Sequence, residues 1–363
     1  MRKSEIMRAC LLVSLGLFVA AFTASNAFAD SFDSGGDRLA ALQNDDGGWD
    51  WDPADDGNPA SPSPLNTVGP IGMGLAQAYL NTGEHLSSLT SAGALLLSKT
   101  NNFSPSDGYL AATLDEIFSV TTYTDHVTAN FYDPLAAGTY DRNGVDTNYD
   151  TAGYVASILA SRTSQGIGNL GAWDVGMGLY AAAMAGADTT EWILGTQTAV
   201  NNLDGNGYYD VIGLAGALLG LSSVGADFDP TAGEHATASN LGDLANVLAS
   251  YQLSTGGFAW NSNYVIEGDN NETVQETAYA ILALSQYDAA GYSNEILAAQ
   301  AYLISIQLPT GGWENYLGSG ENNEITGEAL WALNAPVPEP ATMTLLGIGL
   351  AGMAATQWRR RVS

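Results

Sequence analysis

The sequence predicts an all-α protein, an (α/α)6 toroid of about six helical hairpins, and three observations lead to this prediction. The phrase Gln-x-x-x-Gly-Gly-aromatic occurs three times, at residues 43–49, 252–258 and 307–313, and recurrence on this scale indicates a repeat architecture. Each copy follows a run of helical length and precedes an acidic loop and a second run. The second runs are apolar on nearly all sides, which is typical of helices buried all round.

The spacing of the phrases predicts the number of hairpins. The last two copies begin 55 residues apart, and the first begins 209 residues before the second, which is about four steps of ~52 residues. Three degenerate copies therefore fit between them, at the aromatic residues Phe103, Trp173 and Tyr208. The buried second helices are expected at residues 68–80, 109–118, 175–185, 211–221, 274–284 and 325–333. Residues 151–160 are a further candidate, which would give seven hairpins.

The phrase itself has a physical interpretation. A glycine just past a helix end can adopt the left-handed conformation that caps free carbonyl groups. Gly47, Gly256 and Gly311 are expected to do so. The aromatic residue that follows is expected to pack against the next hairpin.

The three phrases resemble the repeats of the prenyltransferase/squalene-cyclase superfamily, whose members are α/α toroids. The resemblance covers residues 30–334 and is clear at Trp49, Phe258 and Trp313. It implies the fold and leaves the activity open, because this toroid hosts cyclases, lipid transferases and non-catalytic domains.

The sequence departs from the catalytic patterns of that superfamily. Squalene-type cyclases protonate their substrate with an Asp-x-Asp-Asp acid, and this string is absent; the nearest acidic segment, residues 52–56, has a different spacing. Protein prenyltransferases hold zinc with Asp, Cys and His. The only cysteine here is Cys10, which lies in the N-terminal 29 residues that are predicted below to be a signal peptide. The sequence therefore favours a protein that is not an enzyme.

The N-terminal 29 residues read as a Sec-type signal peptide. Basic residues precede an apolar stretch at 11–22, and Ala27-Phe28-Ala29 forms a small-residue cleavage site. We expect signal peptidase to cut after Ala29.

The C-terminal residues 335–363 resemble the PEP-CTERM sorting signal, which exosortases of Gram-negative bacteria recognise. Pro338, Glu339 and Pro340 precede an apolar run at 343–355, and Arg359, Arg360 and Arg361 follow it. The run is long enough to form a short transmembrane helix, and the arginines would stop it at the inner face of the membrane. The sequence thus predicts export through the inner membrane, and a cell-surface or extracellular protein with a toroid body at residues 30–334.

The strongly acidic composition of the chain argues against nucleic acid and anionic lipid as partners. The formal net charge is −29, and between the two processing sites 37 acidic residues face only Arg38, Lys99, Arg142 and Arg162. A surface this acidic repels nucleic acid and anionic lipid headgroups.

A short polar or acidic residue stands at the start of each predicted inner helix. If the inner helices run parallel, these residues form a ring at one mouth of the toroid: Asn66, Asp107, Asp174, Asp210, Glu272 and Glu324. The simplest interpretation is helix capping, in which a side-chain oxygen accepts bonds from free backbone N–H groups.

Two of these positions carry paired carboxylates. Glu276 follows Glu272 by four residues, and Glu328 follows Glu324 by four, so each pair shares one helix face. Like charges at this spacing repel, which favours a bound cation or ligand. Calcium at these four glutamates is one hypothesis, since oxygen ligands suit it; a sugar site and acid/base catalysis by paired carboxylates are the others. We expect no other cofactor.

Aromatic residues flank the same mouth. Trp49, Phe258 and Trp313 are expected to pack between hairpins, whereas Trp51 and Trp260 lie two residues beyond the phrase and are better candidates for ligand stacking. Together with the export signals, this favours a binding or structural role toward extracellular polysaccharide. The alternatives are a glycoside hydrolase or polysaccharide lyase that uses the ring carboxylates, and a divergent terpenoid cyclase.

Overall fold

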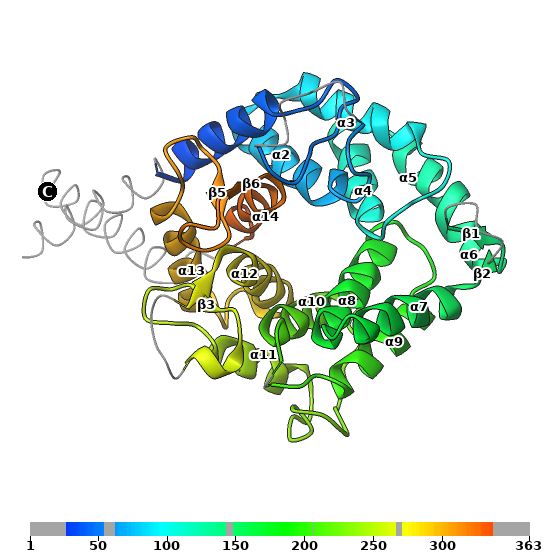
Figure 1. Cartoon of the computed structure of the whole chain (residues 1–363), viewed down its shortest axis with the longest axis vertical. Coiled ribbons are helices and arrows are strands. Elements are labelled where there is room, and N and C mark those ends of the chain that lie inside the picture. Colours follow the sequence, from blue (N-terminus) through cyan, green and yellow to red (C-terminus); the bar gives the residue numbers. More distant parts are fainter. Residues whose placement is uncertain (1–26, 54–61, 143–147, 206, 266–270, 337–363) are drawn as a thin grey trace, which may run out of the picture.

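The computed structural model describes residues 27–53, 62–142, 148–205, 207–265 and 271–336. Within them, six helices form an inner ring in which each helix packs against the next and the last packs back on the first (Figure 1). The inner helices are α2 (Val68–Thr82), α4 (Ser106–Phe118), α8 (Gly168–Met184), α10 (Asp210–Ser223), α12 (Val274–Asp288) and α14 (Asn323–Leu333). The predicted α/α toroid is confirmed, and each predicted inner helix is present.

An outer helix precedes each inner helix in the chain. The outer layer consists of a first helix at residues 27–41, α3 (Leu86–Ser98), α7 (Thr151–Ser164), α9 (Thr190–Asn201), α11 (Leu241–Ser250) and α13 (Ser293–Ser305). Because α7 packs against α8 and α9 on the outside of the ring, the segment that could have been a seventh inner helix is the outer partner of α8. Six hairpins are therefore described.

One connection is longer than the others. Between α4 and α7 the chain forms α5 (Thr122–Val127), the π-helix η2 (Thr128–Tyr132), α6 (Asp133–Ala136) and the antiparallel strands β1 (Tyr140–Asp141) and β2 (Asn148–Tyr149). Edge-on aromatic contacts hold this segment together: the Phe131 ring lies 5.0 Å from Tyr140 and 5.5 Å from Tyr154. It lies on the outer rim of the ring between α4 and α7 (Figure 1).

Glycine lets the inner helices approach closely. At the contact between α8 and α10, a Cβ on Gly176 would overlap the Gly216 backbone, and one on Gly220 would overlap the Gly176 carbonyl. The inner helices can therefore be rich in small residues and still bury their whole circumference.

The glutamine of each phrase ties two hairpins together. In all three copies its side-chain N–H₂ donates to the first phrase glycine and to the next outer helix. Gln43 Nε2 lies 2.8 Å from Gly47 O and 2.9 Å from Ser88 O, and Gln252 Nε2 lies 2.8 Å from Gly256 O and 2.7 Å from Glu295 O. The third copy closes the ring.

In that third copy, Gln307 Nε2 donates to Gly311 O at 2.7 Å and to Ser31 O of the first helix at 3.2 Å. The last hairpin is thus bonded to the first helix across 276 residues of sequence.

The phrase glycines have the backbone that the sequence predicts. Gly47, Gly256 and Gly311 have φ values of 92°, 96° and 96°. Their role differs from helix capping, however. The Gly47 N–H donates to Asn44 O, a residue beyond the end of the first helix, so the glycine closes a tight turn after the helix.

The phrase aromatic begins a short hairpin in two copies. Phe258 opens β3 (Phe258–Ala259), which pairs with β4 (Glu272–Thr273), and Trp313 opens β5 (Trp313–Glu314), which pairs with β6 (Glu321–Asn322). Both side chains are fully buried, as is Trp49, which confirms their packing role. A 3-10 turn, η3 (Ser262–Val265), follows β3.

No helix among the described residues has the length and apolar character needed to span a bilayer. The predicted signal peptide and the apolar run at 343–355 lie outside the described residues, apart from Ala27, Phe28 and Ala29, which belong to the first helix.

Candidate functional site

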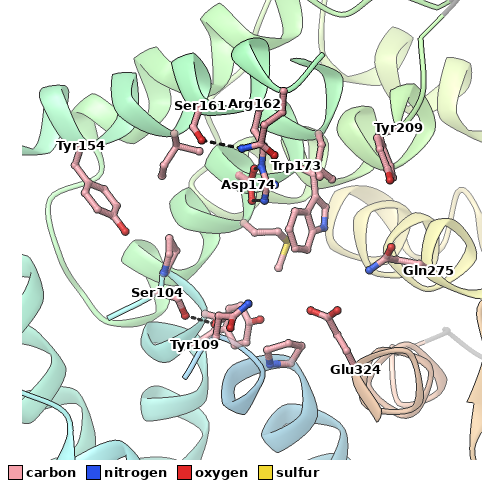
Figure 2. Close-up of a pocket in the computed structure, with 18 of the residues that line it drawn as sticks. Ser104, Tyr109, Tyr154, Ser161, Arg162, Trp173, Asp174, Tyr209, Gln275 and Glu324 are labelled. Atoms are coloured by element: carbon pink, nitrogen blue, oxygen red, sulfur yellow. Dashed lines mark hydrogen bonds and ion pairs between the residues drawn. The ribbon is translucent and has the colours of Figure 1, made fainter. Parts of the chain in front are cut away.

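A cavity of about 570 Å³ occupies the end of the ring where the inner helices begin (Figure 2). Its walls carry both aromatic and polar side chains, and the polar ones are more numerous. The aromatic lining is Trp51, Tyr109, Tyr154, Trp173 and Tyr209, and the polar lining is Asn66, Ser104, Ser106, Arg142, Ser161, Arg162, Gln165, Asp174, Gln275 and Glu324.

Loops that follow the phrases position one wall. The loop after the first phrase covers the start of α14: the Asn323 N–H donates to Trp51 O at 2.9 Å. The loop after the third phrase covers the start of α12 in the same way, and Asn315 accepts from the Gln275 N–H at 3.0 Å. Trp51, Gln275 and Glu324 are held at the cavity by these contacts.

The outer helix α7 supplies the opposite wall with an ion pair. Arg162 donates to Asp174 of α8 through Nε at 2.5 Å and through Nη2 at 3.0 Å, as Figure 2 shows. The hydrogen bond to Asp174 raises the pKa of Arg162. A two-point contact of this kind fixes both side chains.

The neighbouring Arg142 also lines the cavity and lies over the Tyr154 ring, 5.8 Å from its centre. The cavity therefore carries two guanidinium groups in a chain whose net charge is −29.

Glu324 and Glu328 form a buried carboxyl pair one helical turn apart. Glu324 lines the cavity, while Glu328 is fully buried behind it. Glu328 accepts hydrogen bonds from Tyr279 Oη at 2.9 Å and from Gln275 Nε2 at 3.1 and 3.2 Å.

Burial is the main cause of the raised pKa values of Glu324 and Glu328. It raises the pKa of Glu324 to about 8, and the charge of Asp174 adds to the rise. Burial also raises the pKa of Glu328 well above the usual range, and the charge of Glu324 adds to it. At neutral pH the pair therefore holds at least one proton, because two adjacent buried carboxylates cannot both ionise.

The predicted ring of six polar residues divides into two sets. Asn66, Asp174 and Glu324 line the cavity. The other three are engaged elsewhere. Asp107 is buried in an ion pair with Lys99, whose Nζ lies 2.7 Å from Oδ1, and Asp210 accepts from the Ser262 N–H at 3.1 Å.

Helix capping does not explain the ring at Asp174 and Glu324, whereas Asp210 accepts from the free Val211 N–H at the start of α10 at 2.9 Å. Asp174 lies in the second turn of α8, where it pairs with Arg162, because α8 begins at Gly168. The residue whose side chain caps α14 is Asn322, which accepts from the Ile325 N–H.

The other predicted pair, Glu272 and Glu276, lies away from the cavity lining. Glu272 belongs to β4, and Glu276 is buried in the first turn of α12, where it accepts from Thr273 Oγ1. Burial raises the pKa of Glu276 to about 7. Calcium binding by these two residues with Glu324 and Glu328 stays a prediction. In the described part of the chain, only Asp37, Glu84 and His85 form a group of three or more acidic, His or Cys side chains with ligand atoms within 4.8 Å of one another.

The two tryptophan candidates have different surroundings. Trp51 lines the cavity with its side chain 37% exposed. Trp260 instead stacks on Tyr208 and Tyr264, with ring centres 5.0 and 4.8 Å away.

The sequence did not predict Arg142, Arg162 and Gln275 as site residues. The two arginines could have been found from the rarity of basic residues in this chain.

Comparisons with known proteins find similarities to both parts of the chain. Residues 336–361 match the PEP-CTERM protein-sorting motif, which confirms the predicted sorting signal and implies exosortase processing. The chain is 29% identical over 162 residues to drimenyl diphosphate synthase of Streptantibioticus cattleyicolor, a match that spans 41% of this chain and 29% of that protein.

Two solved structures resemble the toroid. A protein from Actinoplanes aligns with a TM-score of 0.51 at 17% identity, covering 85% of this chain and 99% of that one. The type II terpene cyclase MstE from Scytonema, in complex with geranylgeranyl dihydroxybenzoate, aligns with a TM-score of 0.48 at 14% identity, covering 85% and 97%. The chain is thus an α/α toroid that carries a PEP-CTERM protein-sorting motif.

Proposed function

We propose that this is an exported, exosortase-sorted protein whose central cavity binds a saccharide of the extracellular polysaccharide at the cell surface. The observation that carries the proposal is the mixed lining of the cavity. Flat aromatic faces stand beside amide, hydroxyl, carboxyl and guanidinium groups around one space of about 570 Å³, a volume within the usual range of small-ligand sites.

Each class of side chain has a role in such a site. The rings of Trp51 and Trp173 offer apolar faces to the C–H side of a sugar ring, which is an amphipathic ligand. Asn66, Gln165 and Gln275 offer donors and acceptors for its hydroxyl groups. A dry terpenoid chamber would need fewer polar groups, since each one that stays unpaired beside an apolar ligand costs free energy.

The guanidinium groups favour an acidic sugar. Arg38 and Lys99 are paired with Glu321 and Asp107 away from the cavity, and the fork of Arg162 is occupied by Asp174. Arg142, which lines the cavity over the Tyr154 ring, is therefore the guanidinium group that would meet a ligand. An arginine fork recognises a carboxylate in a planar, two-point geometry. Uronate residues of a polysaccharide would meet this requirement.

A glycan array with the full-length chain in detergent tests the proposal, run with and without calcium. We expect binding to acidic oligosaccharides that Trp51→Ala weakens at least about tenfold, since hot-spot aromatic residues contribute about 2 kcal/mol or more. Trp260→Ala is the matched control, because its ring stacks on Tyr208 and Tyr264 away from the cavity lining. Absence of glycan binding, or equal loss in both variants, would refute the proposal.

A second candidate, acid catalysis in the same cavity, is favoured by the Glu324–Glu328 pair. A carboxyl group that keeps its proton at neutral pH can serve as a general acid, and Glu324 is positioned at the cavity. Its substrate would be a glycosidic bond, or an isoprenoid if the partial match to drimenyl diphosphate synthase extends to chemistry.

Two assays separate these possibilities. Release of reducing ends from the bound glycan, lost in Glu324→Gln with binding retained, would support a hydrolase. Turnover of an isoprenoid diphosphate with no affinity for glycans would support a cyclase and refute the saccharide proposal.

A further inference from the structure

We propose that Asp37, Glu84 and His85 form a binding site for a divalent transition metal ion on the outside of the toroid. Asp37 belongs to the first helix, and the other two residues form the turn between α2 and α3. Their ligand atoms all lie within 4.8 Å of one another. The residues that line the central cavity are a separate set, so this site is independent of the proposed saccharide site.

The imidazole of His85 is directed into this group. Its Nε2 atom lies 3.7 Å from Asp37 Oδ1, and the side chain is only 8% exposed. Within the part of the chain that the structure describes, this buried nitrogen has no hydrogen-bond partner. A buried polar atom without a partner is costly to a fold, and metal coordination would satisfy it.

The backbone around His85 is built to place the ring there. His85 has a φ of 67°, in the left-handed region that a non-glycine residue adopts at a cost. Facing it, Gly36 provides the space for the ring: a Cβ at this position would come within 2.7 Å of His85 Nε2 and 2.8 Å of Cδ2. The turn and the first helix thus fit around the imidazole.

The ligand set selects the class of metal. One neutral imidazole nitrogen and two carboxylates suit zinc and similar transition ions, whereas calcium and magnesium prefer oxygen ligands alone. Donors around a tetrahedral zinc lie about 3.4 Å apart, so small movements bring the three atoms to this geometry. The side chain of Asp37 is 75% exposed, and Glu84 is also exposed, so packing does not prevent these movements.

Such an ion would join the first helix to the α2–α3 turn. The first helix occupies the seam of the ring: Gly35 faces Leu330 of α14, and Gly36 faces Ala78 of α2. An ion held by both sides of the contact binds the native state and therefore stabilises the closed ring.

Titration calorimetry of zinc chloride into the full-length chain in detergent tests this proposal. We expect one saturable zinc site that Asp37→Asn and His85→Asn each weaken at least about tenfold. Asparagine tolerates the left-handed backbone of His85, so the second variant keeps the turn. The matched control is Asp33→Asn, which removes the same charge one turn away on the same exposed helix face and is expected to change zinc affinity less than about twofold.

The chemistry of the site gives a second readout. Cobalt(II) bound at the site is expected to give visible d–d bands that disappear in His85→Asn, and calcium is expected to leave zinc binding unchanged. The proposal is overturned by the absence of saturable zinc binding. It is also overturned by equal weakening in Asp33→Asn, or by unchanged affinity in His85→Asn, since both outcomes describe general attraction of cations to an acidic surface.

Discussion

The two arcs of the ring are built differently. The phrase arc comprises the three hairpins whose turns contain an intact phrase: the first helix with α2, α11 with α12, and α13 with α14. They are adjacent because α14 packs on α2. The cavity arc comprises α3 with α4, α7 with α8, and α9 with α10, and it supplies most of the residues that line the cavity.

Different interactions hold the hairpins of each arc. The phrase arc repeats one device, a glutamine bonded to its own turn and to the next outer helix. The cavity arc uses individual contacts instead. Lys99 Nζ bonds Leu65 O and the Asp107 carboxylate, and Asn169 Nδ2 bonds Asp204 O at 2.7 Å. The phrase arc is thus held by one repeated set of glutamine hydrogen bonds. The cavity arc lacks this repeated set, and it is the arc that supplies most of the side chains around the cavity.

The largest effect is expected from the buried ion pair of the cavity arc. Lys99→Met leaves Asp107 without its partner at a position that is 0% exposed, which should lower the free energy of unfolding by about 3–5 kcal/mol. Arg38→Met is the comparison in the phrase arc, where the Arg38 side chain is 25% exposed and a loss of about 1 kcal/mol or less is expected. Urea denaturation measures both, and similar losses would contradict the different construction of the two arcs.

A phrase glycine should tolerate substitution less well than a loop glycine with the same backbone. In Gly311→Ala a Cβ would overlap the Ser34 carbonyl at φ 96°, whereas Gly318, at φ 85°, has nothing within 4 Å. We expect Gly311→Ala to cost about 3 kcal/mol or more and Gly318→Ala about 1 kcal/mol. Equal thermal melts would show that backbone strain alone, without the contact to the first helix, determines the requirement for glycine.

The buried acids of α12 and α14, which belong to the phrase arc, predict a pH dependence. A carboxyl group with a raised pKa binds its proton more tightly in the folded state, so stability falls as pH rises between the usual glutamate value of about 4.3 and the folded value. For Glu324 that window extends to about pH 8, and Glu276 adds to it up to about pH 7.

We therefore expect the melting temperature to fall between pH 5 and pH 8. Self-repulsion of the acidic chain acts in the same direction, so the double variant Glu324→Gln/Glu328→Gln isolates the pair and should have a shallower slope. An unchanged slope would mean that the pair does not hold a proton at neutral pH.

The smallest effect on the toroid is expected from the sorting segment. Replacing Arg359, Arg360 and Arg361 by Asn should leave the melt of the toroid unchanged while an uncleaved, mis-sorted precursor accumulates, because these arginines orient the short apolar run. Intact-mass analysis of the exported protein measures the processing. Normal cleavage in this variant would contradict the role assigned to the arginines.

The phrase arc was the part of the fold that the sequence predicted best. Glycine, glutamine and aromatic residues at fixed spacing carry local geometry, so Gly256 and Gly311 could be recognised from the chain alone. The start of α8 at Gly168 was missed because a degenerate phrase was expected at residues 171–173, and the ordinary helix there contains no turn glycine with positive φ.

The candidate site was predicted less completely, for a different reason. Glu324 and Glu328 could be paired because both lie on one helix, where a spacing of four residues fixes their relation. The partner of Asp174 could not be identified, since Arg162 lies on a separate helix and meets it only when α7 packs on α8. Contacts between helices depend on packing angles that a single sequence does not encode locally.

The bond from Gln307 to Ser31 has a consequence for how the chain folds. Each hairpin is local in sequence and can form early, but the ring closes only when the last hairpin meets the first. This contact includes the bond between Gln307 and Ser31, which are 276 residues apart, and the packing of α14 on α2. Contacts this distant form slowly, because the chain entropy must be lost first. A chain that is synthesised or translocated from its N-terminus therefore exists for a time as an open arc, with the apolar edges of the first helix and of the latest hairpin uncovered, until α14 is present to pack on α2.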